Sequence, residues 1–82
     1  MDACGIVDGE YVHVWNVTNG ERFETYAIPG ARGSGEICVN GAAARRCTAG
    51  DKVIIVAFVL ADEPVTRQVI IVDDNNRIAQ RL

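Results

Sequence analysis

The chain has 82 residues, which is the size of one small domain. Hydrophobic residues make up 49% of it and aromatic residues only 6%, so a core must consist mainly of Val, Ile, Leu and Ala. Eight basic and eleven acidic residues give a net charge of −3 without a basic patch, which argues against a nucleic-acid partner. No apolar run approaches the ~20 residues of a membrane-spanning helix, and no signal peptide is visible, so we expect a cytoplasmic protein.

Cysteine and histidine usage argues against a disulfide framework and against a metal site. Cys4, Cys38 and Cys47 are odd in number and lack CxxC spacing, which is typical of reduced thiols in the cytoplasm. The single histidine, His13, lies within a strand pattern and has no second histidine to share a metal with. We therefore expect no metal.

The first residues resemble the end of a helix. Gly5 suits the left-handed position just after a helix, and Ile6 is the apolar residue that commonly follows it. Four residues are too few to nucleate a helix, so we expect the chain to begin inside an element. The alternative is that Gly5 lies in an ordinary loop.

A hairpin follows. Residues 11–17 alternate and are rich in β-branched side chains, Asn19-Gly20 is the strongest short signal for a type I′ turn, and 22–28 form the return strand. Strand alternation places Arg22 and Tyr26 on one side, which could line a pocket. Thr25 points to the opposite side, so a ligand role for it needs its backbone, a bulge or a strand end.

The rest of the chain reads as short strands and turns. We expect a loop over 29–35, a strand over 36–40, one helical turn over 41–46, a turn over 49–51, an apolar strand over 52–61 and a strand over 67–72. A polar turn over 73–76 follows, and we expect 74–82 to be a loose tail of the domain. This pattern predicts a single mainly β domain over 1–82, a small barrel with one or two short helical turns.

Several motifs in register resemble the aspartate 1-decarboxylase family. They are Trp15–Gly20 (WNVTNG), Arg22-Phe23, Thr25-Tyr26, Arg32-Gly33-Ser34, Asn40–Ala44 (NGAAA), and Gly50-Asp51 followed by Val53-Ile54-Ile55. The resemblance covers roughly residues 2 to 60. It implies a six-stranded double-psi β-barrel, a homo-oligomer (a tetramer) and decarboxylation of L-aspartate to β-alanine for pantothenate synthesis.

The resemblance also implies a chemistry. The family's cofactor is a pyruvoyl group, formed when a Gly-Ser bond cleaves itself, which holds the substrate as a Schiff base. Arg22 matches the arginine that grips a substrate carboxylate, Tyr26 the proton donor, and Thr25 a substrate-contacting residue. Gly41, Ala42 and Ala43 match the backbone segment that contacts the substrate, and Asn40 matches a residue near the pyruvoyl end. Without the motifs, a strand arginine and tyrosine are more often surface residues, and Gly-Ala-Ala-Ala is more often a packing turn.

One part of the family pattern is missing. The cleaved Gly-Ser lies upstream of the helix end at Asp2 to Gly5, and Gly33-Ser34 matches a different, uncleaved pair. We therefore expect that the chain does not decarboxylate aspartate by itself. Three explanations are open. The chain is an N-terminally truncated decarboxylase, or it is a barrel that only binds. The third is a short relative that either is complemented by a partner chain, such as an N-terminal peptide, or catalyses another reaction.

Overall fold

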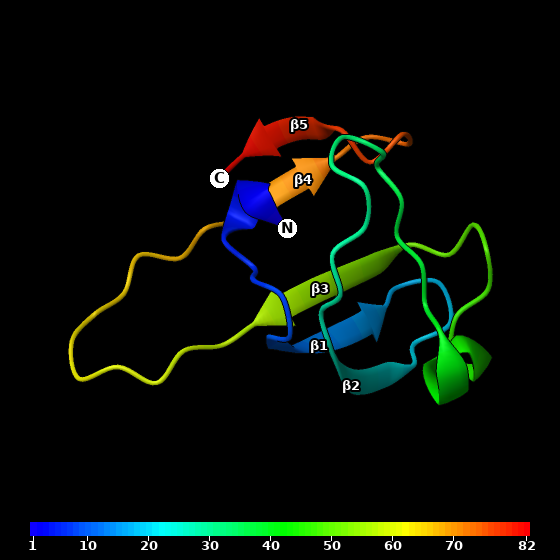
Figure 1. The fold of residues 1–82 in the computed structure, drawn as a ribbon, viewed down its shortest axis with the longest axis horizontal. Helices are drawn as coiled ribbons and strands as arrows, with labels where there is room; N and C mark the ends of the chain where they lie inside the picture. Colours follow the sequence, from blue (N-terminus) through cyan, green and yellow to red (C-terminus); the bar gives the residue numbers. More distant parts are fainter.

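The computed structural model describes all 82 residues and is mainly β, as the sequence predicts. Its elements are η1 (Asp2–Cys4), β1 (Tyr11–Asn16), β2 (Arg22–Tyr26), η2 (Gly41–Arg45), β3 (Val53–Ala57), β4 (Ile70–Val72) and β5 (Ile78–Arg81). A three-stranded antiparallel sheet has the order β2-β1-β3, and β4 and β5 form a separate hairpin (Figure 1). The structure thus has five strands in two sheets, whereas the family resemblance implies six strands.

The three-stranded sheet has an outer face and an inner face that differ in burial. The outer face carries Tyr11, His13 and Trp15 of β1 and Arg22, Glu24 and Tyr26 of β2. The inner face carries Val12, Val14, Asn16, Phe23 and Thr25. Only Val12, Val14, Phe23 and Asn16 are buried in the whole chain. The predicted alternation of side chains is therefore confirmed, but the core that it builds is small.

The turn between β1 and β2 is longer than the sequence predicts. Asn16 N–H donates to the carbonyl of Glu21 at 2.8 Å, and Gly20 N–H donates back to the carbonyl of Asn16 at 2.9 Å, so four residues form the loop. Gly20 takes a φ of +79°, whereas Asn19 does not have the positive φ that a type I′ turn requires. The turn prediction is therefore wrong in type, because the side chain of Asn16 supports a wider loop.

Several predicted strand limits are also corrected. Residues 36–40 form no strand, because no neighbouring chain segment pairs with their backbone. The apolar strand predicted over 52–61 ends at Ala57, where its pairing with Val12 of β1 ends, and Leu60 is fully exposed. The strand predicted over 67–72 covers only Ile70–Val72. In an antiparallel pair, a strand ends where its partner ends.

The predicted loose tail contains a strand. β5 pairs antiparallel with β4, and Arg81 Nη1 donates to the carbonyl of Ala3 at 3.0 Å. The Asp73 carboxylate accepts the N–H groups of Asn75 at 2.9 Å and Arg77 at 3.0 Å, and Asn76 takes a φ of +58°. The polar turn over 73–76 is therefore a hairpin connection whose side chains imitate backbone hydrogen bonds.

Both helical segments are single turns that agree with the sequence prediction. Gly5 has a φ of +80° and donates to the carbonyl of Asp2, while Ile6 N–H donates to the carbonyl of Met1 at 3.1 Å. This pair of bonds is the Schellman motif that ends helices. Neither η1 nor η2 is long and apolar enough to cross a membrane.

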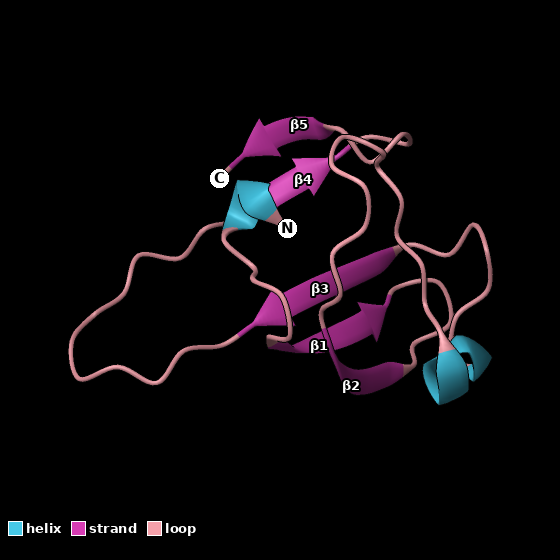
Figure 2. Ribbon diagram, viewed as in Figure 1, coloured by secondary structure: helices cyan, strands magenta, loops and turns pink.

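The loop over 29–35 attaches to the β4–β5 hairpin. Asn76 Nδ2 donates to the carbonyl of Gly35 at 2.6 Å, and the Arg77 guanidinium donates to the carbonyl of Gly33. A Cβ atom on Gly35 would lie 2.6 Å from the carbonyl oxygen of Asn75, so only glycine allows this approach. Loops and turns connect most of the elements (Figure 2), and the β4–β5 hairpin lies on the side of β3 that faces away from β1 in the view of Figure 1.

Candidate functional site

The predicted site residues on β2 lie on both faces of the sheet. Arg22 and Tyr26 are exposed on the outer face, while Thr25 is half-buried on the inner face, where its Cα partner is Val12. Arg22 and Tyr26 are four positions apart on an extended strand, so their Cα atoms are about 13 Å apart. A ligand as small as an amino acid would contact both side chains only if they lean toward Glu24 between them.

Arg22 is held by an aromatic ring and by no carboxylate. Its guanidinium carbon lies 4.8 Å from the centroid of the Trp15 ring, on the neighbouring strand. The two ion pairs of the structure use other arginines, Arg46 with Glu21 at 2.6 Å and Arg32 with Asp2. The Arg22 guanidinium therefore keeps its N–H groups available for an anion from outside.

Tyr26 has an exposed hydroxyl beside an aromatic cluster. Its side chain is 61% exposed, its hydroxyl makes no hydrogen bond, and its Cα partner on β1 is Tyr11. The Tyr11 hydroxyl lies 3.3 Å from His13 Nε2, and the His13 ring packs edge-on against Phe58 at 5.0 Å. The single histidine is thus part of an aromatic cluster, and the structure contains no group of metal-ligating side chains.

The second group of predicted residues lies at η2. Asn40 is extended, Gly41 takes a φ of +66°, and the following residues form a 3-10 helix in which Ala43 is half-buried. A 3-10 helix bonds each N–H to the third carbonyl back, so the N–H groups of Gly41 and Ala42 have no partner within η2. The predicted helical turn is confirmed, although it is of the tighter 3-10 type.

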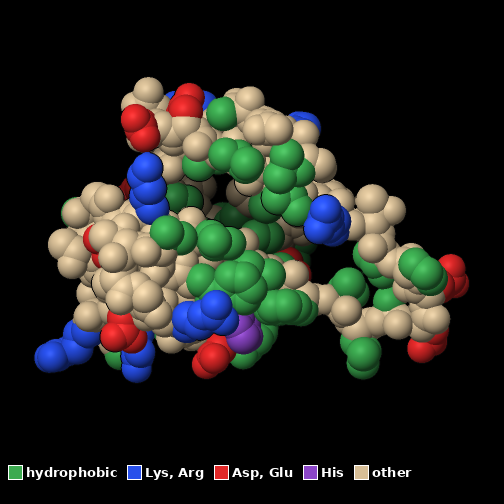
Figure 3. All heavy atoms as spheres, turned by 180° about the vertical axis from the view of Figure 1, so that it is seen from behind, with side chains coloured by type: hydrophobic (Ala, Val, Ile, Leu, Met, Phe, Trp, Pro, Cys, Tyr) green, Lys and Arg blue, Asp and Glu red, His purple; other side chains and the backbone are tan.

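A broad hollow between the two sheets is bordered by some of the predicted site residues. Its border includes Thr25, Tyr26, Asn40, Gly41 and Ala43, whereas Arg22 and Ala42 lie outside it. More than half of the chain borders this hollow, so it is far larger than a site for one small molecule. In the view from behind, hydrophobic side chains surround the hollow across the middle of the molecule (Figure 3).

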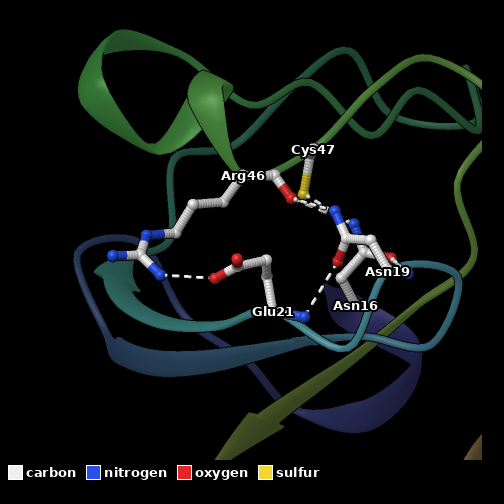
Figure 4. Close-up of polar contacts among 5 residues, drawn as sticks. All are labelled: Asn16, Asn19, Glu21, Arg46 and Cys47. Carbon is white, nitrogen blue, oxygen red and sulfur yellow. Dashed lines mark hydrogen bonds and ion pairs between the residues drawn. The ribbon is translucent and has the colours of Figure 1, made fainter.

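A polar network joins the β1–β2 turn to the segment that follows η2 (Figure 4). Asn16 is only 2% exposed, and its Oδ1 accepts the N–H groups of Thr18 at 2.9 Å and Asn19 at 3.2 Å. Its Nδ2 donates to the carbonyl of Arg46 at 3.1 Å and to Asp51 Oδ2 at 2.8 Å. Asn16 thereby fixes the hairpin turn against the segment after η2.

Further contacts strengthen this connection. Asn19 Nδ2 donates to the same Arg46 carbonyl at 2.9 Å, and Asn19 Oδ1 accepts the N–H of Glu21 at 2.9 Å. The Arg46 guanidinium and Glu21 form a half-exposed ion pair, which contributes little stability on its own. The sequence reasoning did not find these roles for Asn16 and Asn19, although the unusual WNVTNG run contains both.

Asp51 completes the network with a charged acceptor. The hydrogen bond from the Asn16 amide, followed by the N–H of Thr48 at 2.9 Å, lowers the pKa of the Asp51 carboxyl below its ordinary value of 3.8. Both donors favour the ionised form, and the small cost of desolvation opposes them. The network is therefore stronger while Asp51 is a carboxylate.

Comparison with known proteins gives consistent matches. The sequence profile of the family described as Aspartate decarboxylase matches residues 1–79. The chain is 55% identical to "Aspartate 1-decarboxylase 2" of Polaromonas sp., over 94% of this chain and 64% of that protein. It is 55% identical to "Aspartate 1-decarboxylase" of Caldicellulosiruptor saccharolyticus, over 98% and 66%, and 52% identical to that of Paraburkholderia xenovorans, over 95% and 65%. The chain spans about 64–66% of the length of these relatives.

Replacing Asn16 tests the network. Asn16→Ala removes a buried amide and leaves its partners unpaired, so we expect a loss of about 2–3 kcal/mol in the free energy of unfolding. Asn19→Ala, at an exposed position, is the control and costs about 1 kcal/mol. Urea unfolding followed by circular dichroism measures both. Equal losses for the two variants would contradict a central role for Asn16.

Acid should weaken the same network. A carboxyl with a lowered folded-state pKa stabilises the fold fully above its ordinary pKa and loses that contribution as the pH falls through the folded value. We expect the urea midpoint of unfolding to fall when the pH is lowered below 3.8. Asp51→Asn should reduce this dependence of the midpoint on pH, while it keeps an oxygen acceptor for Asn16 and Thr48. Asp74→Asn, an exposed change in the β4–β5 turn, is the control. An unchanged acid slope in Asp51→Asn would refute the assignment.

Proposed function

The chain belongs to the aspartate decarboxylase family, and from that premise we propose that it carries part of the active site of an enzyme that converts L-aspartate to β-alanine and carbon dioxide. The observation that supports this most is the family match over residues 1–79, which includes every predicted site residue. The relatives named above all carry aspartate 1-decarboxylase as their name.

The proposed reaction needs an electron-withdrawing group that the side chains of this chain do not offer. A pyruvoyl group supplies an electron sink for loss of the carboxylate. By the family resemblance, the one Gly-Ser pair of the chain, Gly33-Ser34, matches a pair that is not cleaved. We therefore propose that the group comes from outside these 82 residues.

Arg22 binds a carboxylate of the substrate in this proposal. A planar guanidinium donates two parallel N–H bonds to one carboxylate, which fixes both distance and orientation. Support comes from the absence of any ion pair to Arg22 and from its exposed position on the outer face. Two of the other arginines, Arg32 and Arg46, are already paired with acidic side chains.

Tyr26 donates the proton that replaces the lost carboxylate. A phenol O–H can donate a proton to a carbanion-like centre. Two observations support this role. Tyr26 lies on the same face as Arg22, and its hydroxyl makes no hydrogen bond with another group of the chain. Thr25 and the segment Asn40–Ala43 contact the substrate from the inner side in this proposal.

The split of these residues over two faces supports a homo-oligomer. One copy places Arg22 outside and Thr25 inside the sheet, so a complete site needs a second surface against the first. Seventeen large hydrophobic side chains are exposed, including Phe58, Val59 and Leu60, which is far more than a stable small monomer of this size usually shows. A complementing N-terminal peptide is the alternative way to cover this surface.

Light scattering tests the assembly. We expect a mass that is a multiple of the 8.9 kDa of one chain, because association buries the exposed apolar side chains. Dilution should lower the thermal midpoint, since the subunits stabilise one another by mass action. A particle of 8.9 kDa at all concentrations would contradict the homo-oligomer.

Substitution tests the catalytic roles in the protein purified from its native source. We expect Tyr26→Phe to lower the rate of β-alanine release by about 10²–10⁴-fold, since it removes the donor proton. Arg22→Ala should mainly raise KM for aspartate, because it removes a carboxylate contact. Tyr11→Phe is the matched control, since Tyr11 lies directly opposite Tyr26 with a similar exposure of 58%.

Two outcomes would count against the proposal. A Tyr26→Phe protein with the turnover of the Tyr11→Phe control would exclude Tyr26 as the proton donor. A native protein that releases no β-alanine from aspartate, and whose intact mass equals that of the 82 residues alone, would favour a catalytically incomplete relative that only binds.

A further inference from the structure

The contact between Arg22 and Trp15 connects two adjacent strands of the outer face. The two residues are direct Cα partners in the β1–β2 register, so the backbone itself holds them opposite one another. The guanidinium carbon lies 4.8 Å from the ring centroid, within the range of a cation–π interaction. Trp15 is half-buried and Arg22 is exposed, so the ring supports the cation from below while the cation faces solvent.

The acidic residues near this pair do not occupy the guanidinium. Glu21, the residue before Arg22, is bound to Arg46 at 2.6 Å. Glu24 lies two residues from Arg22 on the same face but forms no ion pair with it, and its Cα partner is His13. Arg22 therefore keeps its position through a contact that consumes none of its N–H donors.

From this geometry we infer that Trp15 is a positioning residue: its ring holds the Arg22 guanidinium in place and leaves the N–H groups free for a substrate carboxylate. The inference rests on the proposed function of Arg22. A carboxylate partner from the chain would also fix the arginine, but it would block the N–H groups that the substrate needs. An aromatic face fixes the guanidinium without this competition, because the attraction acts through the ring quadrupole.

Trp15 has neighbours on both sides, since it lies on the central strand of the larger sheet. His13, two residues earlier on β1, packs edge-on against it with ring centroids 6.4 Å apart. On the other flank, Ile54 of β3 is the Cα partner of Trp15. The position of the guanidinium is thus defined by the centre of the sheet, and the long arginine side chain loses less freedom when it binds an anion.

The chain contains one tryptophan, so tryptophan fluorescence reports on the surroundings of Trp15 alone. Succinate is a suitable probe, because it presents two carboxylates and cannot be decarboxylated through an amine. We expect succinate to change Trp15 emission saturably in the wild-type chain, and Arg22→Ala to alter the emission without ligand and to abolish the response. Arg67→Ala, which removes an exposed arginine ahead of β4, is the control and should respond like the wild type.

Calorimetry then measures succinate affinity in the Trp15 variants. We expect Trp15→Leu to weaken binding by about tenfold or more, and Trp15→Phe to weaken it only a few-fold, since a phenyl ring retains a smaller cation–π attraction. Thermal midpoints are measured in parallel. A purely structural role for Trp15 would lower the thermal midpoint without the graded loss of affinity from Trp to Phe to Leu.

The outcomes separate the two ideas. If Arg22→Ala abolishes binding while Trp15→Phe and Trp15→Leu both keep wild-type affinity, the positioning inference is wrong and the carboxylate role of Arg22 stands. If the wild-type chain shows no saturable response, or if Arg22→Ala binds succinate normally, the carboxylate role of Arg22 is wrong and the inference falls with it. If Trp15→Leu does not fold, the comparison of Trp15→Phe with wild type and the ligand-free emission of Arg22→Ala decide.

Discussion

The buried amide of Asn16 is the interaction on which the arrangement of the larger sheet and η2 depends. It is the only polar side chain that is fully buried, and its oxygen and nitrogen bind two different parts of the chain. The oxygen shapes the turn after β1, while the nitrogen holds the Arg46 carbonyl and the Asp51 carboxylate. A buried amide that lost these partners would cost more than its hydrogen bonds contribute, so the network favours one arrangement over all others.

Polar connections of this kind matter here because the apolar core is small. Three hydrophobic side chains, Val12, Val14 and Phe23, are buried, so little apolar surface is available to hold the two sheets together. Instead, side chains bind backbone carbonyls across large distances in sequence, as Asn76 does with Gly35 and Arg81 with Ala3. Such bonds fix geometry well but contribute only about 1 kcal/mol each. The exposed apolar surface therefore supports the proposal that further protein covers it.

Local rules predicted the elements whose signals are local. Alternation of β-branched residues predicted the faces of β1 and β2, and the glycine rule predicted the end of η1 at Gly5. The limits of β3 and the absence of a strand over 36–40 depend on which segments find a pairing partner, and no window of sequence contains that information. The turn at Asn19-Gly20 was mispredicted because Asn16, three residues earlier, competes for the same backbone groups.

The same two-residue period of a strand sets what the proposed site can be. Arg22, Glu24 and Tyr26 necessarily point one way and Thr25 the other, whatever the chemistry requires. The family resemblance names Arg22, Thr25 and Tyr26 together, but the side chains of a single strand cannot all point at one small molecule. If Arg22 and Tyr26 are to act on a substrate, a second surface must therefore pack against the outer face. Trp15 can support Arg22 inside such an interface, because an aromatic ring does not neutralise the cation. The incomplete burial of the chain and the two-sided distribution of the proposed site thus support the same proposal, in which a further protein surface packs against the sheet.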